Sequence, residues 1–142
     1  MKTASIIYVS LTIAALLGMI DSSYVGLHAS QGFLIPCGFA GGCDEVLSSP
    51  YARLLGISIA WFGLAFYFTI AATSLFAFFG FPEALRLSFI PAALALPTSL
   101  YLLYLQAFVI RAFCDYCLLS ATLVFMIFCL HLWARPWRST GS

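Results

Sequence analysis

Charged side chains are scarce in this sequence: Asp, Glu, Lys and Arg together make up 8% of its 142 residues. Six basic residues are balanced by five acidic ones, so the chain lacks the clustered positive charge with which proteins bind nucleic acids. Hydrophobic residues make up 63% of the chain, and its mean hydropathy is +1.06. Soluble domains contain fewer apolar and more charged residues, so the composition indicates an integral membrane protein.

The few charges leave four long apolar runs, at about 4–20, 55–79, 87–110 and 114–134. A helix needs about 20 apolar residues to cross a bilayer, and backbone groups in hydrocarbon must be hydrogen-bonded within the segment. Alternation of apolar and polar residues, which would indicate strands, is absent from these runs. We therefore predict an all-α integral membrane protein, a bundle of four transmembrane helices in one domain over residues 1–142.

Positive charge predicts how this bundle lies in the membrane. With four spans both chain ends lie on one side, and the basic residues of that side are Lys2, Arg86, Arg135 and Arg138. Arg53 and Arg111 lie on the other side, together with most of the acidic residues. Cytoplasmic loops carry the excess of Lys and Arg. We therefore expect a multi-pass protein of the plasma or inner membrane with both termini in the cytoplasm.

The connection between the first two runs, about residues 21–53, is the only long one, and connections of that length are usually functional or partly structured. The topology places it on the extracytoplasmic face. Glycines surround Cys37 and Cys43 within it and allow the backbone to move. Ser49 followed by Pro50 is typical of a helix start, and we expect a short half-helix before the second span.

Four of the five cysteines fall into two pairs in the sequence, Cys37 with Cys43 and Cys114 with Cys117. The topology places both pairs outside the cytoplasm, where disulfides persist. The second pair is a C-x-x-C motif at the start of the last span, where free backbone N–H groups and the helix dipole favour a thiolate. The pattern predicts thiol–disulfide exchange, although Asp115 inside the motif opposes a thiolate by like charge.

Two readings without redox chemistry remain open: a loop held by a structural disulfide, and a zinc site built from four sulfur ligands. The first pair has a five-residue spacer, longer than the roughly two to four residues usual in structural zinc sites, so we expect no metal site. Cys129 lies deep in the last span and is expected to be a small buried hydrophobe with an inert thiol.

The two cysteine pairs, the segment from Cys43 to Ala52, and a second span with Gly56, Gly63 and Tyr67 resemble the vitamin K epoxide reductase family, specifically its prokaryotic single-domain members. The resemblance covers nearly the whole chain. Its most specific element is the order of the four cysteines with a serine, Ser49, six residues after the second. The related DsbB-type oxidases carry their C-x-x-C before the loop pair, so the order here excludes them.

The resemblance implies a membrane thiol oxidoreductase that passes electrons from a thioredoxin-fold partner through the cysteines to a quinone of the ubiquinone or menaquinone class, generating disulfides. By the same resemblance, Cys37 exchanges with the partner, Cys43 attacks an inner disulfide at Cys114, and Cys117 faces the quinone. Ser49 matches the family serine near the quinone. Because the sequence ends without a thioredoxin domain, we expect the partner to be a separate DsbA-like protein.

The sequence also departs from the animal members of the family. Ala121 stands where those enzymes have a tyrosine, and the chain contains no asparagine, so the amide that they present to vitamin K is missing. Disulfide formation is therefore favoured over the alternative of vitamin K epoxide or quinone reduction, and a disulfide- or zinc-stapled membrane scaffold remains a third reading. Gln106, Tyr101 and Tyr104 either face a pocket or join helices, and Arg111 is expected to reach the lipid headgroups.

Overall fold

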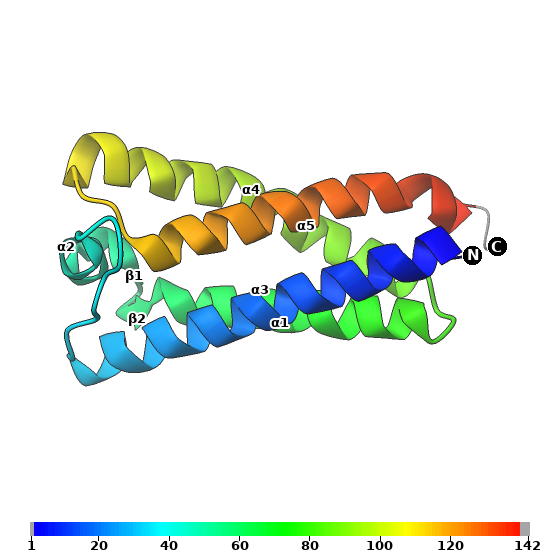
Figure 1. Cartoon of the computed structure of the whole chain (residues 1–142), viewed down its shortest axis with the longest axis horizontal. Helices are drawn as coiled ribbons and strands as arrows, with labels where there is room; N and C mark the ends of the chain where they lie inside the picture. The colour runs from blue at the N-terminus through cyan, green and yellow to red at the C-terminus, as the bar shows by residue number, and fades with distance from the viewer. Residues whose placement is uncertain (1, 140–142) are drawn as a thin grey trace.

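The computed structural model describes residues 2–139 and forms a bundle of four long helices (Figure 1). These are α1 (Lys2–Gln31), α3 (Ile59–Phe78), α4 (Ala84–Tyr104) and α5 (Asp115–Ser139). A π-helix (Leu105–Ile110) continues α4 without a break. Four helices, counting α4 with its π-helix as one, are long and apolar enough to cross a membrane. The predicted all-α, four-span membrane bundle is confirmed.

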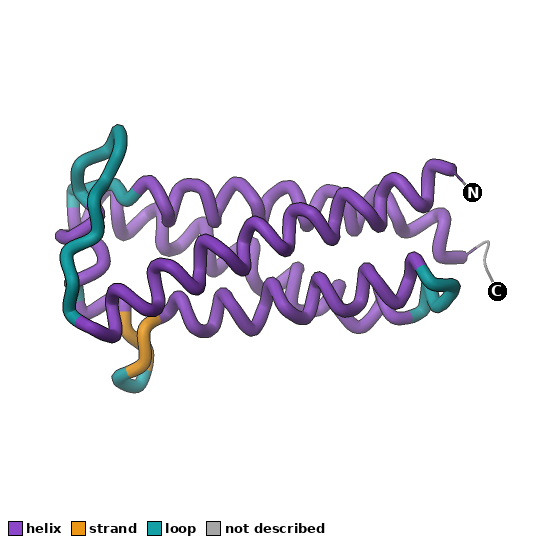
Figure 2. Tube along the Cα trace, turned by 60° about the horizontal axis from the view of Figure 1, so that its bottom comes forward, coloured by secondary structure: helices purple, strands orange, loops and turns teal. Residues whose placement is uncertain are grey.

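The remaining elements gather at one end of the bundle, which we call the loop end (Figures 1 and 2). They are α2 (Cys43–Ser48), a 3-10 helix (Pro50–Ala52), and the strands β1 (Arg53–Leu54) and β2 (Ile57–Ser58). The start of α1, the end of α5 and the turn between α3 and α4 lie together at the opposite end. The predicted half-helix before the second span is present as α2.

The first helix is longer than the sequence predicts. We expected a span over about 4–20 and a loop over about 21–53, but α1 continues to Gln31. Asp21 introduces a charge without removing a backbone hydrogen bond, so it does not end the helix. The helix ends at Gly32, whose φ of +73° suits a glycine, while the N–H of Phe33 bonds the carbonyl of His28 at 3.1 Å. The connection that we call the cysteine loop is therefore residues 32–42.

The second helix starts later than about residue 55, because a small hairpin precedes it. Ser49 and Pro50 begin only the 3-10 helix, after which Arg53 pairs with Ser58 across the antiparallel strands. The two turn residues, Leu55 and Gly56, both have positive φ, as a type I′ hairpin turn requires. Ser58 then caps α3, its hydroxyl accepting a hydrogen bond from the Ala60 N–H at 3.4 Å.

Tyr67 is the central packing residue of the bundle. It is fully buried, and its ring lies against Gly18 of α1, which leaves no space for a Cβ there. Its hydroxyl lies 2.7 Å from the hydroxyl and 3.0 Å from the carbonyl oxygen of Ser120 in α5. Small residues allow membrane helices to approach closely, and polar side chains join them. One residue of α3 therefore connects α1 and α5.

This packing predicts that Gly18→Ala destabilises the bundle more than Gly26→Ala on the same helix. The methyl group at residue 18 would overlap the Tyr67 ring, whereas at residue 26 the nearest atom is a Trp61 ring carbon at 3.1 Å. Overpacking of this kind costs about 1–3 kcal/mol. Thermal unfolding in detergent should give the lower midpoint for Gly18→Ala, and the reverse order would contradict the proposed packing.

Candidate active site

The structure brings all four predicted site cysteines together at the loop end. Cys37 and Cys43 form a disulfide with their Cα atoms 5.6 Å apart, while Cys114 and Cys117 are free thiols. Cys43 and Cys114 belong to one buried cluster with Val46, and Cys37 and Cys117 pack against it. Cys43 is 1% exposed and Cys114 is fully buried, whereas Cys37 is partly exposed. Of the outer pair, Cys37 is therefore the member that faces solvent.

The carboxylate of Asp115 holds the cysteine loop. Its Oδ2 accepts hydrogen bonds from the backbone N–H groups of Gly38 at 2.7 Å and Phe39 at 2.6 Å, and its Oδ1 accepts one from Ala40 at 2.8 Å. Hydrogen bonds to an ionised acceptor are short and strong. Sequence reasoning treated Asp115 only as a charge that opposes a thiolate. In the structure its side chain connects the C-x-x-C motif to the loop that carries the other pair.

Two further contacts hold the loop on either side of its disulfide. The N–H of Gly42 donates to the carbonyl of Phe113 at 3.1 Å, and the hydroxyl of Tyr116 donates to the carbonyl of Pro36 at 3.1 Å. At Gly42 a Cβ would lie 2.8 Å from both the Phe113 oxygen and the Ala112 Cβ, so only glycine permits this approach. The glycine-rich loop is thus fixed against the start of α5.

The sulfur of Cys114 occupies the position of a helix cap. Cys114 immediately precedes α5, and its Sγ accepts a hydrogen bond from the N–H of Cys117 at 3.3 Å. The hydrogen bond from the Cys117 thiol, aided by the N–H groups of Cys117 and Tyr116, holds the pKa of Cys114 below its ordinary value, although burial acts in the opposite direction. The expected thiolate-stabilising helix terminus is therefore found at Cys114.

Gln106 positions the inner pair from the preceding helix. It is 3% exposed, and its Oε1 accepts a hydrogen bond from the Cys114 N–H at 3.1 Å. Its backbone carbonyl also accepts from Ala112 at 3.1 Å and from Arg111, which has a φ of 60°. A π-helix often marks a functional site. From the sequence, Gln106 either faces a pocket or joins two helices. In the structure it does both: it lines the cavity described below and bonds the segment that begins α5.

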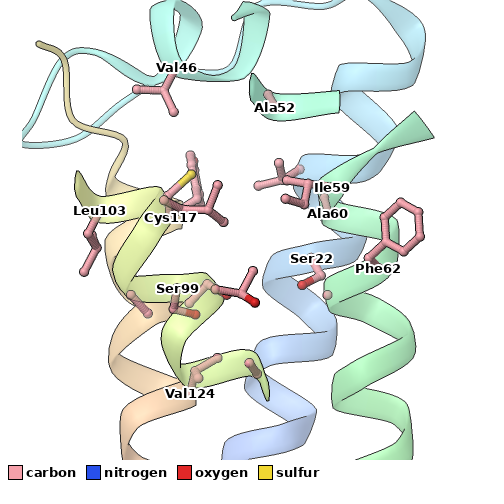
Figure 3. A pocket seen from close by; sticks show the side chains of 18 of the residues that line it. Ser22, Val46, Ala52, Ile59, Ala60, Phe62, Ser99, Leu103, Cys117 and Val124 are labelled. Atoms are coloured by element: carbon pink, nitrogen blue, oxygen red, sulfur yellow. The ribbon is translucent and has the colours of Figure 1, made fainter. Parts of the chain in front are cut away.

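An apolar cavity of about 540 Å³ lies beneath α2, among the four long helices (Figure 3). Its volume is within the roughly 300–1,000 Å³ of small-molecule sites. Cys117 and Ser49 both line it, so the structure brings together the two residues expected near a cofactor. The Ser49 hydroxyl donates to the carbonyl of Val46 at 2.7 Å. Other lining residues include Asp21, Ser22, Pro91, Gln106, Tyr67, Ser120 and Ala121.

Several residues that the sequence singled out lie outside this site. Arg111, Tyr101 and Tyr104 are exposed and do not line the cavity. Cys129 is exposed on the outer surface of the bundle, which corrects the expectation that it is buried: hydropathy places a residue at membrane depth but does not say which face of the helix it occupies. Within residues 2–139, no group of three or more His, Cys, Asp or Glu side chains is arranged to hold a metal ion.

The chain was compared with models of known protein families. A model described as the vitamin K epoxide reductase family matches residues 9–132. The matched segment includes both cysteine pairs, Ser49 and nearly all of the four long helices. It covers most of the chain, as the resemblance in the sequence predicted.

The loop contacts predict that Asp115→Asn frees the cysteine loop, because the amide nitrogen of asparagine cannot accept hydrogen bonds. Hydrogen bonds to an ionised acceptor are stronger than those to a neutral one, so their loss should make the loop open more often and its amides exchange faster. Hydrogen exchange at the amides of residues 38–40 measures this rate. Asp44→Asn is the matched control, since the Asp44 side chain accepts from the Ile35 N–H through Oδ1 at 3.0 Å and asparagine keeps that oxygen. Equal exchange in both variants would contradict the docking role.

Proposed function

The chain belongs to the vitamin K epoxide reductase family of membrane thiol oxidoreductases, and from this we propose that it oxidises a thioredoxin-fold partner and passes the electrons to a quinone. The observation that carries the proposal is that both cysteine pairs share one buried cluster, and that Cys117 of this cluster also lines an apolar cavity. A thiol that lines an apolar cavity among membrane-spanning helices supports electron transfer from a soluble protein to a carrier dissolved in the membrane.

The first step takes place at the outer pair. A thiolate of the partner attacks the sulfur of Cys37, breaking the Cys37–Cys43 disulfide and releasing Cys43 as a thiolate. The partner's second thiol then attacks the mixed disulfide, so the partner leaves oxidised and both loop cysteines are reduced. The difference in burial supports Cys37 as the point of attack, since Cys43 is 1% exposed. A separate DsbA-like protein has the chemistry that this step requires.

The second step moves the electrons inward. Cys43 attacks an inner disulfide at Cys114 and releases the Cys117 thiolate, and Cys37 then attacks Cys43 and releases Cys114. A lower pKa makes a thiol a better leaving group, so the pKa-lowering contacts at Cys114 favour this release. The product state has a disulfide in the loop and two thiols at the start of α5, which is the pairing that the structure holds.

The third step reoxidises the inner pair. Cys117 and Ser49 line the cavity, whose apolar walls and volume of about 540 Å³ suit a quinone of the ubiquinone or menaquinone class. A quinone supplies a two-electron, two-proton acceptor there. Cys114 and Cys117 form a disulfide and give up two electrons and two protons, which completes the transfer. In this proposal Ser49 lies near the ring, and Cys117 is the sulfur that faces it.

The proposed orientation has both termini in the cytoplasm and the cysteine pairs at the extracytoplasmic face of a plasma or inner membrane. Two observations support it. Lys2 and Arg86 lie at the end of the bundle that carries the termini, together with the Arg86–Glu83 ion pair at 2.8 Å. The loop end carries two basic residues, Arg53 and Arg111, against four at the opposite end, and an excess of basic residues is typical of cytoplasmic loops.

Reduction of vitamin K epoxide is the less favoured activity. Ala121 lines the cavity where the animal enzymes have a tyrosine, so this wall offers a methyl group and no hydroxyl. Assaying epoxide turnover separates this activity from disulfide formation. A zinc-stapled scaffold would instead contain one equivalent of zinc, which metal analysis would detect, and it would not need an electron acceptor.

The proposal predicts that purified protein, given a reduced DsbA-like partner, reduces a soluble quinone, seen as loss of quinone absorbance. Cys117→Ala should abolish the reaction, because the inner disulfide cannot form. Cys129→Ala is the matched control and should leave the rate unchanged, since Cys129 lies outside the site. A wild-type protein without quinone reduction would count decisively against the proposal.

A second prediction concerns the bond between the pairs. In the double variant Cys37→Ala with Cys117→Ala, mild oxidation should join Cys43 to Cys114, because the two side chains share one buried cluster and neither retains its usual partner. Mass spectrometry of the digested protein identifies the cross-linked peptide. Cys129 remains as an internal control and should stay unlinked. If Cys43 stays a free thiol under oxidant, the inward relay fails.

A further inference from the structure

One carboxyl group faces the cavity without a partner. Asp21 lies in α1, is 8% exposed and lines the cavity. Its Oδ1 is buried, and nothing within residues 2–139 forms a hydrogen bond with it. Buried polar atoms are almost always hydrogen-bonded, so each exception needs an explanation. In a membrane-spanning segment an ionisable side chain is costly, and such residues usually serve a function.

Several other polar groups in the cavity wall have protein partners. The hydroxyl of Tyr67 pairs with Ser120, that of Tyr116 donates to Pro36, and the Gln106 amide oxygen accepts from Cys114. The Ser49 hydroxyl is likewise occupied, by Val46. Among residues 2–139, Asp21 Oδ1 is the buried side-chain oxygen without a hydrogen-bond partner, and it belongs to a residue of this wall, so a molecule in the cavity would supply that partner.

The surroundings of Asp21 also limit its charge state. The cavity wall contains no Lys, Arg or His, and its other titratable groups are Tyr51, Tyr67, Tyr116 and Cys117. An unpaired carboxylate in such surroundings costs far more than the neutral acid. In its acid form Asp21 has an O–H to donate, and a quinone oxygen is an acceptor.

The inner cysteine pair lies within electrostatic reach of Asp21. The hydrogen bond from Cys117 lowers the pKa of Cys114, whereas a negative charge at Asp21 would raise it. Ser22, the neighbour of Asp21 in α1, projects into the same cavity as Cys117 (Figure 3). A neutral Asp21 therefore suits both the cavity and the thiolate chemistry at its upper end.

We propose that Asp21, as a carboxylic acid, donates a hydrogen bond to an oxygen of the quinone and delivers one of its two protons. This rests on the proposed function and adds a catalytic residue to it. Cys114 and Cys117 lose two electrons and two protons and form an S–S bond. The electrons and two protons end on the quinone, which leaves as the quinol. One of these protons comes from Asp21, and a proton from the thiols restores the acid.

Two variants separate hydrogen bonding from proton delivery. Binding is measured by titrating decylubiquinone into protein that carries Cys114→Ala and Cys117→Ala, where no turnover occurs. Asp21→Leu should weaken binding about three- to tenfold, the value of one neutral hydrogen bond. Asp21→Asn should bind within about twofold of the parent, because its amide still donates, yet with intact cysteines its quinone reduction should fall at least about a hundredfold, as for loss of a general acid.

Difference infrared spectroscopy tests the acid form directly. In protein that carries Cys114→Ala and Cys117→Ala, addition of decylubiquinone should shift the C=O stretching band of a carboxylic acid. The band should be missing when Asp21→Asn is added. Glu45→Gln is the matched control, because Glu45 is an exposed carboxylate at the loop end and does not line the cavity; it should keep the band, the affinity and the rate.

The outcomes distinguish this inference from the function on which it rests. If wild-type protein reduces the quinone but Asp21→Leu binds decylubiquinone with unchanged affinity and no band shifts, Asp21 has no role at the quinone and the inference is wrong. If wild-type protein reduces no quinone at all, the proposed function is wrong. Unchanged quinone reduction in Asp21→Asn would overturn proton delivery by this residue.

Discussion

The hydrogen bonds from three consecutive loop amides to the Asp115 carboxylate are the contact on which the site depends. The cysteine loop contains several glycines and has no secondary structure of its own over residues 32–42, so ordering it carries a large entropic cost. The carboxylate offsets part of that cost with short bonds that a neutral group would make more weakly. Because Asp115 lies between Cys114 and Cys117, the group that orders the loop also lies inside the second redox motif.

The two cysteine pairs are held in place by different kinds of contact. The contacts on the loop involve backbone atoms and exposed side chains at the membrane edge, where water competes for hydrogen bonds and local opening is easy. The inner pair is held differently, by the start of α5, the π-helix and the buried amide of Gln106. We therefore expect the loop that carries Cys37 to open more easily than the segment that holds the inner pair.

The polar groups of the cavity wall also differ in what they contact. The walls of the cavity come from the four long helices, three of which Tyr67 joins, and several of its polar groups hold those helices and the cysteine pair. Asp21 is the exception, a carboxyl group with a buried and unpartnered oxygen. This unpartnered oxygen is the observation on which the proposed hydrogen bond to a quinone rests.

The sequence by itself determined the membrane class, the four spans, the half-helix and the residues of the two cysteine pairs, because hydropathy and motif spacing are local properties set by the bilayer and by sulfur chemistry. It misplaced the end of α1 and the start of α3, since Gly32 and the Leu55–Gly56 turn, not the charges, set those boundaries. Only the tertiary structure revealed what Asp115, Gln106 and Asp21 contact. Gly38 and Asp115 are 77 positions apart in the chain, and the partner of a side chain over that distance is decided by how the helices pack.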